Sequence, residues 1–161
     1  MPKSITPNLW FDTQAEEAAQ YYCSIFPDSR ILDVTHYTEA APGKAGQVLT
    51  VLFELQGQRF TALNGGPQFT FTEAVSFLIE CADQDELDAY WERLTDGGEE
   101  ALCGWCKDRY GLSWQVVPAG IDELFGDDDP ERAQRAMEAM FTMRKLDIAA
   151  LRAAAEGVAA A

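Results

Sequence analysis

Two stretches of the chain, ITPNLWFDTQAEEAAQY at residues 5–21 and VSFLIECADQDELDAYW at residues 75–91, follow the same pattern. Each begins with alternating apolar residues and continues with residues that favour an amphipathic helix, so each predicts a strand followed by a helix. A shift of 70 residues aligns the apolar positions in pairs: Ile5 with Val75, Leu9 with Ile79 and Phe11 with Cys81. This internal repeat predicts two copies of one structural unit.

Three further strands are expected after each helix. In the first half, the strand and helix cover residues 5–11 and 14–26, and the later strands cover 30–37, 47–55 and 58–63. In the second half, they cover 75–81 and 84–94, followed by 99–102, 105–107 and 112–117. Residues 39–46 read as a flexible loop and residues 64–67 as a turn between the halves. The sequence therefore predicts an α+β chain of two βαβββ units, at about residues 4–66 and 73–118, within a single domain spanning 1–161.

The chain beyond Pro118 is expected to be a helical extension over about residues 120–157. Residues 127–130 (DDDP) predict a helix start with proline in the first turn. The following helix places Ala133, Met137, Met140 and Phe141 on one face, which we interpret as core or subunit packing. The Ala-rich segment at the end is expected to pack weakly.

The composition excludes several functional classes. The chain has 161 residues with 12 basic and 27 acidic side chains, giving a net charge of −15. Nucleic acids and anionic membranes attract clustered Lys and Arg, so neither is an expected partner. No apolar run approaches the length of a membrane span, and no signal-peptide core is seen. We therefore expect a cytoplasmic protein with reduced cysteines, of which Cys23 and Cys81 should lie in the core.

Several motifs resemble those of a known family. They are LNGGP at residues 63–67, TEAVSF at residues 72–77 and, most specifically, CGWCKDRYGLSWQVVP at residues 103–118. These stretches resemble the PhnB-like (3-demethylubiquinone-9 3-methyltransferase-like) branch of the vicinal-oxygen-chelate superfamily, which includes glyoxalase I, bleomycin-resistance proteins and extradiol dioxygenases. The resemblance covers about residues 4–145. It implies a glyoxalase/bleomycin-resistance-like fold, in which the two units form curved mixed sheets around a cleft.

The methyltransferase label of that branch lacks support in the sequence. A Rossmann-type methyltransferase has a Gly-rich turn between its first strand and helix, where the methyl donor binds. The corresponding turn here is Asp12-Thr13-Gln14. We therefore do not expect methyl transfer of that type.

Strand alternation identifies candidate binding residues. If the apolar positions of the first strand of each unit face the helix, then Asn8 and Trp10 face the other way, as do Ser76 and Glu80. Gln115 has the corresponding position on the last strand. An apolar face with a few polar groups is typical of a small-molecule site, although such residues are also found as ordinary hydrogen-bonded core residues. Trp105 either packs the strands together or stacks on the ligand, and Glu80 is a weak candidate for a general base.

Metal chemistry is not expected to carry over from the superfamily. By resemblance, Gln115 follows the turn at residues 108–111 and matches a metal-ligand position, and Thr6 and Ser76 match two others. Neutral hydroxyls are poor ligands for zinc or iron. The only histidine, His36, falls on another strand. We therefore predict no metal site and no cofactor.

Cys103 and Cys106 form a CxxC motif with three interpretations. A redox CxxC opens a helix whose N-terminus stabilises the thiolate, whereas this motif is followed by a turn and a strand. Zinc would require a second ligand pair, and no His or Cys follows Cys106. A structural role is favoured, and thiol chemistry and metal binding remain open.

The sequence thus predicts a protein that binds, and in one version transforms, a small organic molecule in the cleft between the two units, without a transition metal. The first alternative is a sequestering or resistance-type binding protein without catalysis. The second is a thiol-based enzyme using Cys103 and Cys106. A homodimer is expected, because each half-barrel leaves edge strands open and a twofold contact is the commonest way of covering them.

Overall fold

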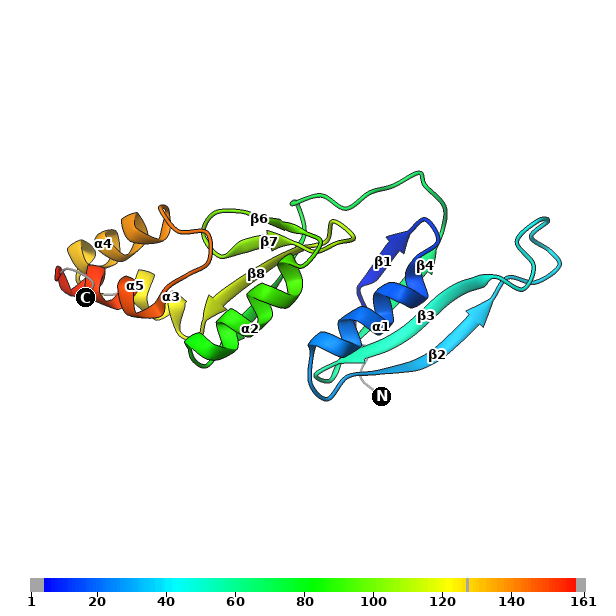
Figure 1. Ribbon diagram of the computed structural model, residues 1–161, viewed down its shortest axis with the longest axis horizontal. Helices are drawn as coiled ribbons and strands as arrows, with labels where there is room; N and C mark the ends of the chain where they lie inside the picture. The colour runs from blue at the N-terminus through cyan, green and yellow to red at the C-terminus, as the bar shows by residue number, and fades with distance from the viewer. Residues whose placement is uncertain (1–4, 127, 159–161) are drawn as a thin grey trace. The chain divides into compact units, whose positions relative to one another are not determined.

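The computed structural model describes residues 5–126 and 128–158. It divides into two compact units, unit one up to Phe71 and unit two from Thr72 onward (Figure 1). No helix in the described ranges is both long enough and apolar enough to span a bilayer.

Unit one is a four-stranded sheet with one helix. It comprises β1 (Asn8–Phe11), α1 (Ala15–Ile25), β2 (Arg30–His36), β3 (Val48–Leu55) and β4 (Gln58–Asn64). The strand order is β1-β4-β3-β2, with β1 parallel to β4 and the other neighbours antiparallel. The first strand begins at Asn8 rather than at residue 5, because Pro7 has no N–H for the ladder and contributes only its carbonyl, which accepts from the Thr61 N–H.

Unit two repeats this arrangement. It comprises β5 (Ser76–Cys81), α2 (Gln84–Thr95), β6 (Glu99–Glu100), β7 (Trp105–Lys107) and β8 (Ser113–Pro118), in the order β5-β8-β7-β6. Again the first strand is parallel to the last, and the remaining pairs are antiparallel. The predicted α+β fold of two βαβββ units is therefore confirmed.

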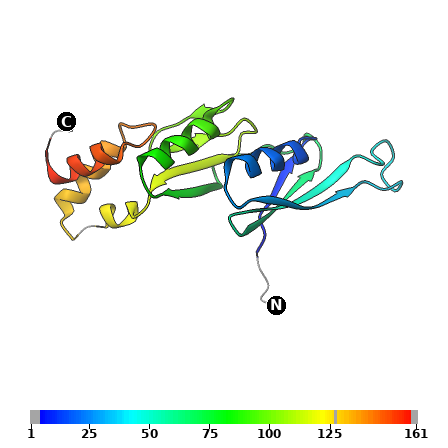
Figure 2. The ribbon, with the colours of Figure 1, turned by 60° about the horizontal axis from the view of Figure 1, so that its bottom comes forward.

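The predicted alternation along the first strand of each unit is also found. In β1, Leu9 and Phe11 are buried while Asn8 is exposed, and in β5 Cys81 is buried while Glu80 is exposed. Each helix covers one face of its own sheet, as Figure 2 shows for α1 in unit one and α2 in unit two. Each unit therefore has one face packed on a helix and one face opposite to it. Cys23 differs from the expectation for a core thiol, because it is only half-buried.

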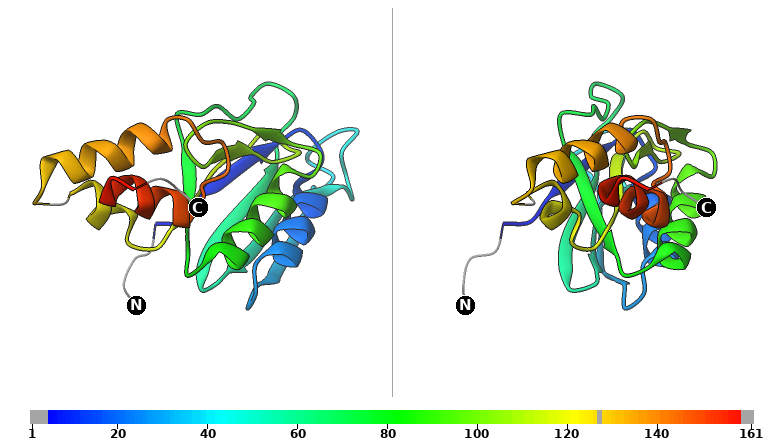
Figure 3. Two further views of the ribbon diagram at one scale, coloured as in Figure 1. Left: turned by 60° about the vertical axis from the view of Figure 1, so that its left-hand side comes forward. Right: turned by 90° about the vertical axis from the view of Figure 1, so that its left-hand side faces the viewer.

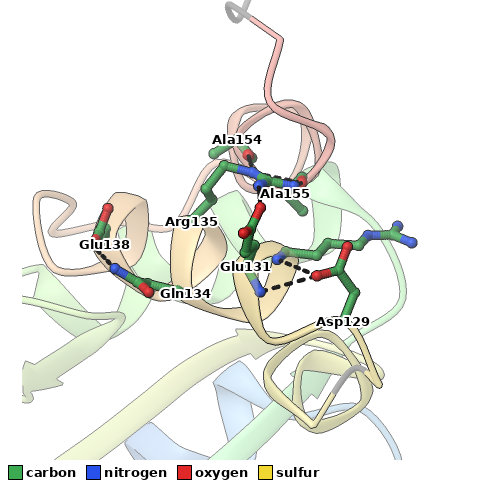
Figure 4. A network of polar contacts seen from close by, with 8 residues as sticks. Asp129, Glu131, Gln134, Arg135, Glu138, Ala154 and Ala155 are labelled. Carbon is green, nitrogen blue, oxygen red and sulfur yellow. Dashed lines mark hydrogen bonds and ion pairs between the residues drawn. The ribbon is translucent and has the colours of Figure 1, made fainter.

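The C-terminal extension consists of α3 (Ile121–Phe125), α4 (Pro130–Met140) and α5 (Ile148–Glu156), with α4 and α5 packed side by side (Figure 3). Asp129 begins α4 as predicted, its carboxylate accepting from the N–H groups of Glu131 and Arg132; Asp127 lies outside the described residues. Arg135 of α4 donates to the carbonyl oxygens of Ala154 and Ala155 at the end of α5 (Figure 4). A cation at a helix C-terminus satisfies its free carbonyls and complements its dipole.

The structure bears on two expectations for this extension. The face with Met137 and Phe141 is not a core face of this chain, because these side chains are 37% and 56% exposed and the buried residue of α4 is Ala136. The Ala-rich segment does not pack weakly, since Leu151 and Ala155 of α5 are fully buried. Small residues allow α4 and α5 to approach closely, which hydrophobic patterning alone did not reveal.

The connection between α4 and α5 is attached to the loop that precedes β7. The N–H groups of Cys103 and Gly104 donate to the carbonyls of Met143 and Arg144, each over 2.8 Å. Leu146, in the same connection, is fully buried. The loop with Cys103 therefore joins the extension to the sheet of unit two.

Candidate functional site

The face of the unit-two sheet opposite α2 carries four of the six predicted site residues. Strand pairing places Trp105 beside Gln115, and Leu78 of β5 beside Gln115 on its other side. Ser76 and Glu80 lie on the same face of β5, two residues before and after Leu78. We call this set of five residues the unit-two face.

A polar pair lies at the centre of the unit-two face. The side-chain amide of Gln115 donates to Ser76 Oγ over 2.9 Å, which leaves the amide oxygen of Gln115 available as an acceptor. Leu78, next to Gln115, is 53% exposed. An oriented amide beside exposed apolar surface can bind an organic molecule with a hydrogen-bond donor.

Glu80 is exposed at the end of the unit-two face. A carboxylate becomes an effective base near neutral pH when burial disfavours its charged form. The sheet of unit two does not provide that burial, so the arrangement within this unit supports a hydrogen-bonding role for Glu80 more than a catalytic one.

Beside Trp105, a small cavity of about 130 Å³ opens between β6, β7 and the residues before β5. Lys107 lies at its edge, with its ammonium 2.5 Å from Glu73. This hydrogen bond raises the pKa of Lys107 and lowers the pKa of Glu73, so both groups are charged near neutral pH. Ser113, paired with Lys107 in the ladder, also lines the cavity.

In unit one, Trp10 is held by the residues that follow β4. Its indole N–H donates to the carbonyl of Gly66 over 2.8 Å, and its ring meets Phe69 edge-on with centroids 5.0 Å apart. Gly65 is required here, because a Cβ at this position would lie 2.2 Å from the Trp10 ring. Asn8 is exposed on the same face of β1. The turn predicted at residues 64–67 thus also fixes the orientation of Trp10.

The larger cavities do not include the predicted residues. One of about 410 Å³ lies in unit one, at the end of β1, and is lined by Asp12, Tyr37, Lys44, Gln47 and Gln68 among others. Another, of about 400 Å³, lies among the C-terminal helices. Sequence patterns did not identify the first, because Lys44 falls in a segment that reads as a flexible loop.

The two cysteines of the CxxC motif differ in environment. The pKa of the Cys106 thiol is raised to about 12, mainly because the thiol is buried. Cys103 is half-buried and has a φ of 62°, in a turn rather than at a helix start. A redox-active CxxC needs a stabilised thiolate, so this geometry supports the structural interpretation.

The residues at the superfamily's metal-ligand positions do not fit a transition metal. Ser76 offers only a hydroxyl and Gln115 only an amide oxygen, and neither is among the imidazole, thiolate and carboxylate ligands that zinc and iron favour. Within residues 5–126 and 128–158, no three His, Cys, Asp or Glu side chains are grouped so that they could hold an ion. His36 is exposed on the edge strand β2.

Comparison with known proteins places the chain in a family. The family model described as 3-demethylubiquinone-9 3-methyltransferase matches residues 3–117. A PhnB protein from Bacillus cereus with the same description is 34% identical; the match covers 71% of this chain and 99% of that protein, with a TM-score of 0.65. No functionally curated protein matches the chain.

Two more distant structures share the fold. The protein PA1353 from Pseudomonas aeruginosa is 17% identical over 72% of this chain and 96% of its own, with a TM-score of 0.59. The fosfomycin resistance protein FosX from Listeria monocytogenes, solved with Mn(II), is 15% identical over 74% of this chain and 94% of its own, with a TM-score of 0.51. The chain therefore belongs to the 3-demethylubiquinone-9 3-methyltransferase family, of PhnB type, within the vicinal oxygen chelate superfamily.

Proposed function

We propose that this protein binds a small organic molecule without a transition metal, with the unit-two face as the binding surface of unit two and with Asn8 and Trp10 as candidate binding residues of unit one. The observation that carries the proposal is the Gln115–Ser76 hydrogen bond beside exposed Leu78 and half-buried Trp105. Small-molecule sites combine apolar surface with a few oriented polar groups, as this face does.

The arrangement of Trp10 supports the same proposal. Its one polar atom already donates to Gly66, so only the apolar surface of the ring remains available to a ligand. A fixed aromatic ring binds an organic molecule at a low cost in side-chain entropy, because it is ordered before the ligand arrives. Within unit one, we therefore expect Trp10 to offer apolar contact to a ligand.

Binding without catalysis is the simpler version of this proposal. Glu80 is the one candidate base on the unit-two face, and it is exposed. Replacing Glu80 by Gln separates the two versions once a ligand is known. A binding protein keeps its affinity and has no turnover to lose, whereas an enzyme that uses this base keeps its affinity and loses turnover.

A thermal-shift screen of small organic molecules tests the proposal. A ligand at 100 times its dissociation constant should stabilise the folded protein by about 2.7 kcal/mol. The same compounds should stabilise the Gln115→Ala variant less. Gln58→Ala is the matched control, because Gln58 lies in a hairpin of unit one and its side-chain amide donates to the neighbouring Arg59 carbonyl. A library without hits, or hits that stabilise Gln115→Ala as strongly as the control, would overturn the proposal.

We further propose that the protein is a cytoplasmic homodimer. The apolar side chains that α4 leaves exposed, Met137 and Phe141, supply surface for a second copy. Net charge of −15 opposes association, so the contact should be apolar and should persist in added salt. Sedimentation equilibrium should give twice the chain mass of 17.8 kDa. A monomer at both low and high salt would contradict this.

A further inference from the structure

The cavity beside Trp105 contains a buried hydroxyl with no partner. Ser113 is 1% exposed, and its Oγ makes no hydrogen bond to any residue that the structure describes. Buried polar atoms are nearly always paired, and an unpaired one calls for an explanation such as a ligand or a solvent molecule. Because Ser113 pairs with Lys107 in the ladder and both line the cavity, the hydroxyl lies on the cavity side of β8.

The charges around this hydroxyl favour a cation. Three glutamates, Glu73, Glu99 and Glu100, line the cavity against one lysine, Lys107. The ammonium of Lys107 is paired with Glu73, and Glu100 accepts from the Trp91 indole N–H. Glu99 lies opposite Lys107 in the β6–β7 ladder, and its charge helps to raise the pKa of Lys107, but among the described residues its carboxylate forms no direct ion pair. It is therefore the carboxylate available to a ligand.

The remaining wall suits an organic cation rather than a metal ion. Trp105 lines the cavity, and an aromatic ring attracts an ammonium group through its π face. A volume of about 130 Å³ accommodates a small head group with the first carbons of its chain, but not a whole drug-sized molecule. A ligand longer than this would extend toward Gln115, which is the neighbour of Trp105 on β8.

We propose that this cavity binds the ammonium group of a small organic amine, with Ser113 Oγ as hydrogen-bond acceptor and Glu99 as counter-charge. This inference rests on the proposed function and deepens it, because it names the chemical class of the ligand's head group. Trp105 lines the same cavity, as do Lys107 and Glu73, which are paired with each other.

The test uses n-butylammonium as the probe, with butyrate and 1-butanol as an anion and a neutral molecule of the same length. Binding to the full ¹⁵N-labelled chain is followed at the indole N–H of Trp105, assigned from its loss in Trp105→Phe. Butylammonium should shift this signal saturably at up to tens of millimolar, and the two other probes should not. Tighter binding of butyrate, or no saturation with butylammonium, would overturn the proposal.

Two variants test the assigned groups. Ser113→Ala should weaken butylammonium binding about tenfold, as expected for a lost hydrogen bond to a charged group. Glu99→Gln should weaken it and reduce its dependence on salt, whereas Glu92→Gln, an exposed glutamate of α2, is the matched control without effect. Since Glu99 is exposed, its variant remains informative if Ser113→Ala does not fold. Unchanged binding in Glu99→Gln would show that Glu99 is not the counter-charge and would overturn the assignment.

The amine site and the proposed function can fail independently of each other. If a library compound binds in a Gln115-dependent way while butylammonium does not bind, the small-molecule proposal stands and the amine assignment fails. If butylammonium binds and depends on Glu99 but no library compound depends on Gln115, the amine site stands on its own.

Discussion

Replacing Gly104 by alanine should destabilise unit two more than the same replacement at Gly111. Both glycines have a left-handed backbone, with φ of +78° and +85°. They lie on either side of β7, in turns of the same CGWCKDRYG stretch at residues 103–111. Comparing the two alanine variants therefore separates the cost of backbone strain from the cost of steric overlap with the new Cβ.

The shared cost is that of an L residue in the left-handed region, about 1–2 kcal/mol. At Gly111 a Cβ would meet nothing within 4 Å, so no further cost arises. At Gly104 the Cβ would lie 2.8 Å from the carbonyl oxygen of Val116 and 3.1 Å from Cδ1 of Leu146. The Val116 oxygen belongs to the backbone of β8 and cannot move alone, so over-packing adds about 1–3 kcal/mol.

Urea unfolding of the wild type and both variants measures this difference. The free energy of unfolding should be lower in Gly104→Ala than in Gly111→Ala by about 1–3 kcal/mol. In thermal melts, each kcal/mol should lower the midpoint by about 2–4 °C. Equal losses in the two variants, within about 0.5 kcal/mol, would refute the claim that the loop before β7 is packed against β8 and Leu146.

Three further predictions concern the packing of Trp10, the reactivity of Cys106 and the metal content. Gly65→Ala should displace Trp10, since a Cβ at residue 65 would lie 2.2 Å from the ring, and an unchanged Trp10 indole NMR signal would contradict the described packing. Iodoacetamide should modify Cys106 slowly at neutral pH and faster as the pH rises toward its pKa of about 12, because the thiolate is the attacking species; a rate that no longer rises above neutral pH would support the thiol-enzyme alternative. Elemental analysis of protein purified without a His tag should detect no stoichiometric zinc, nickel or iron. One metal ion per chain would contradict the claim that the residues around Ser76 and Gln115 do not bind a transition metal.

Features with a local signature were predictable from the sequence. The alternation in β1 and β5 and the repeated strand-helix pattern led to the correct unit architecture. A strand that is buried on one face has an apolar residue at every second position, and this pattern is visible in the sequence. The same alternation placed Ser76, Glu80 and Gln115 on one face of unit two. The start of α4 was also predicted correctly, because the Asp129 cap is formed with the N–H groups of the residues that follow it directly.

Features that depend on contacts between distant residues were not predictable. The stripe with Met137 and Phe141 has the period of a buried helix face, yet the buried residue of α4 is Ala136, and α4 packs on α5 and α3. The cavity at Ser113 depends on the ladder register that places Lys107 opposite it, and on Glu73, which lies 34 residues before Lys107 in sequence. A single sequence contains no local pattern for such pairings.

The central claim, that this protein binds a small organic molecule through the unit-two face, is tested most directly by chemical-shift mapping of a thermal-shift hit on the ¹⁵N-labelled protein. The account predicts shifts at the side-chain amide of Gln115 and the indole N–H of Trp105, with loss of binding in Gln115→Ala. Shifts confined to the C-terminal helices, around the cavity lined by Ile121 and Ile148, would contradict it.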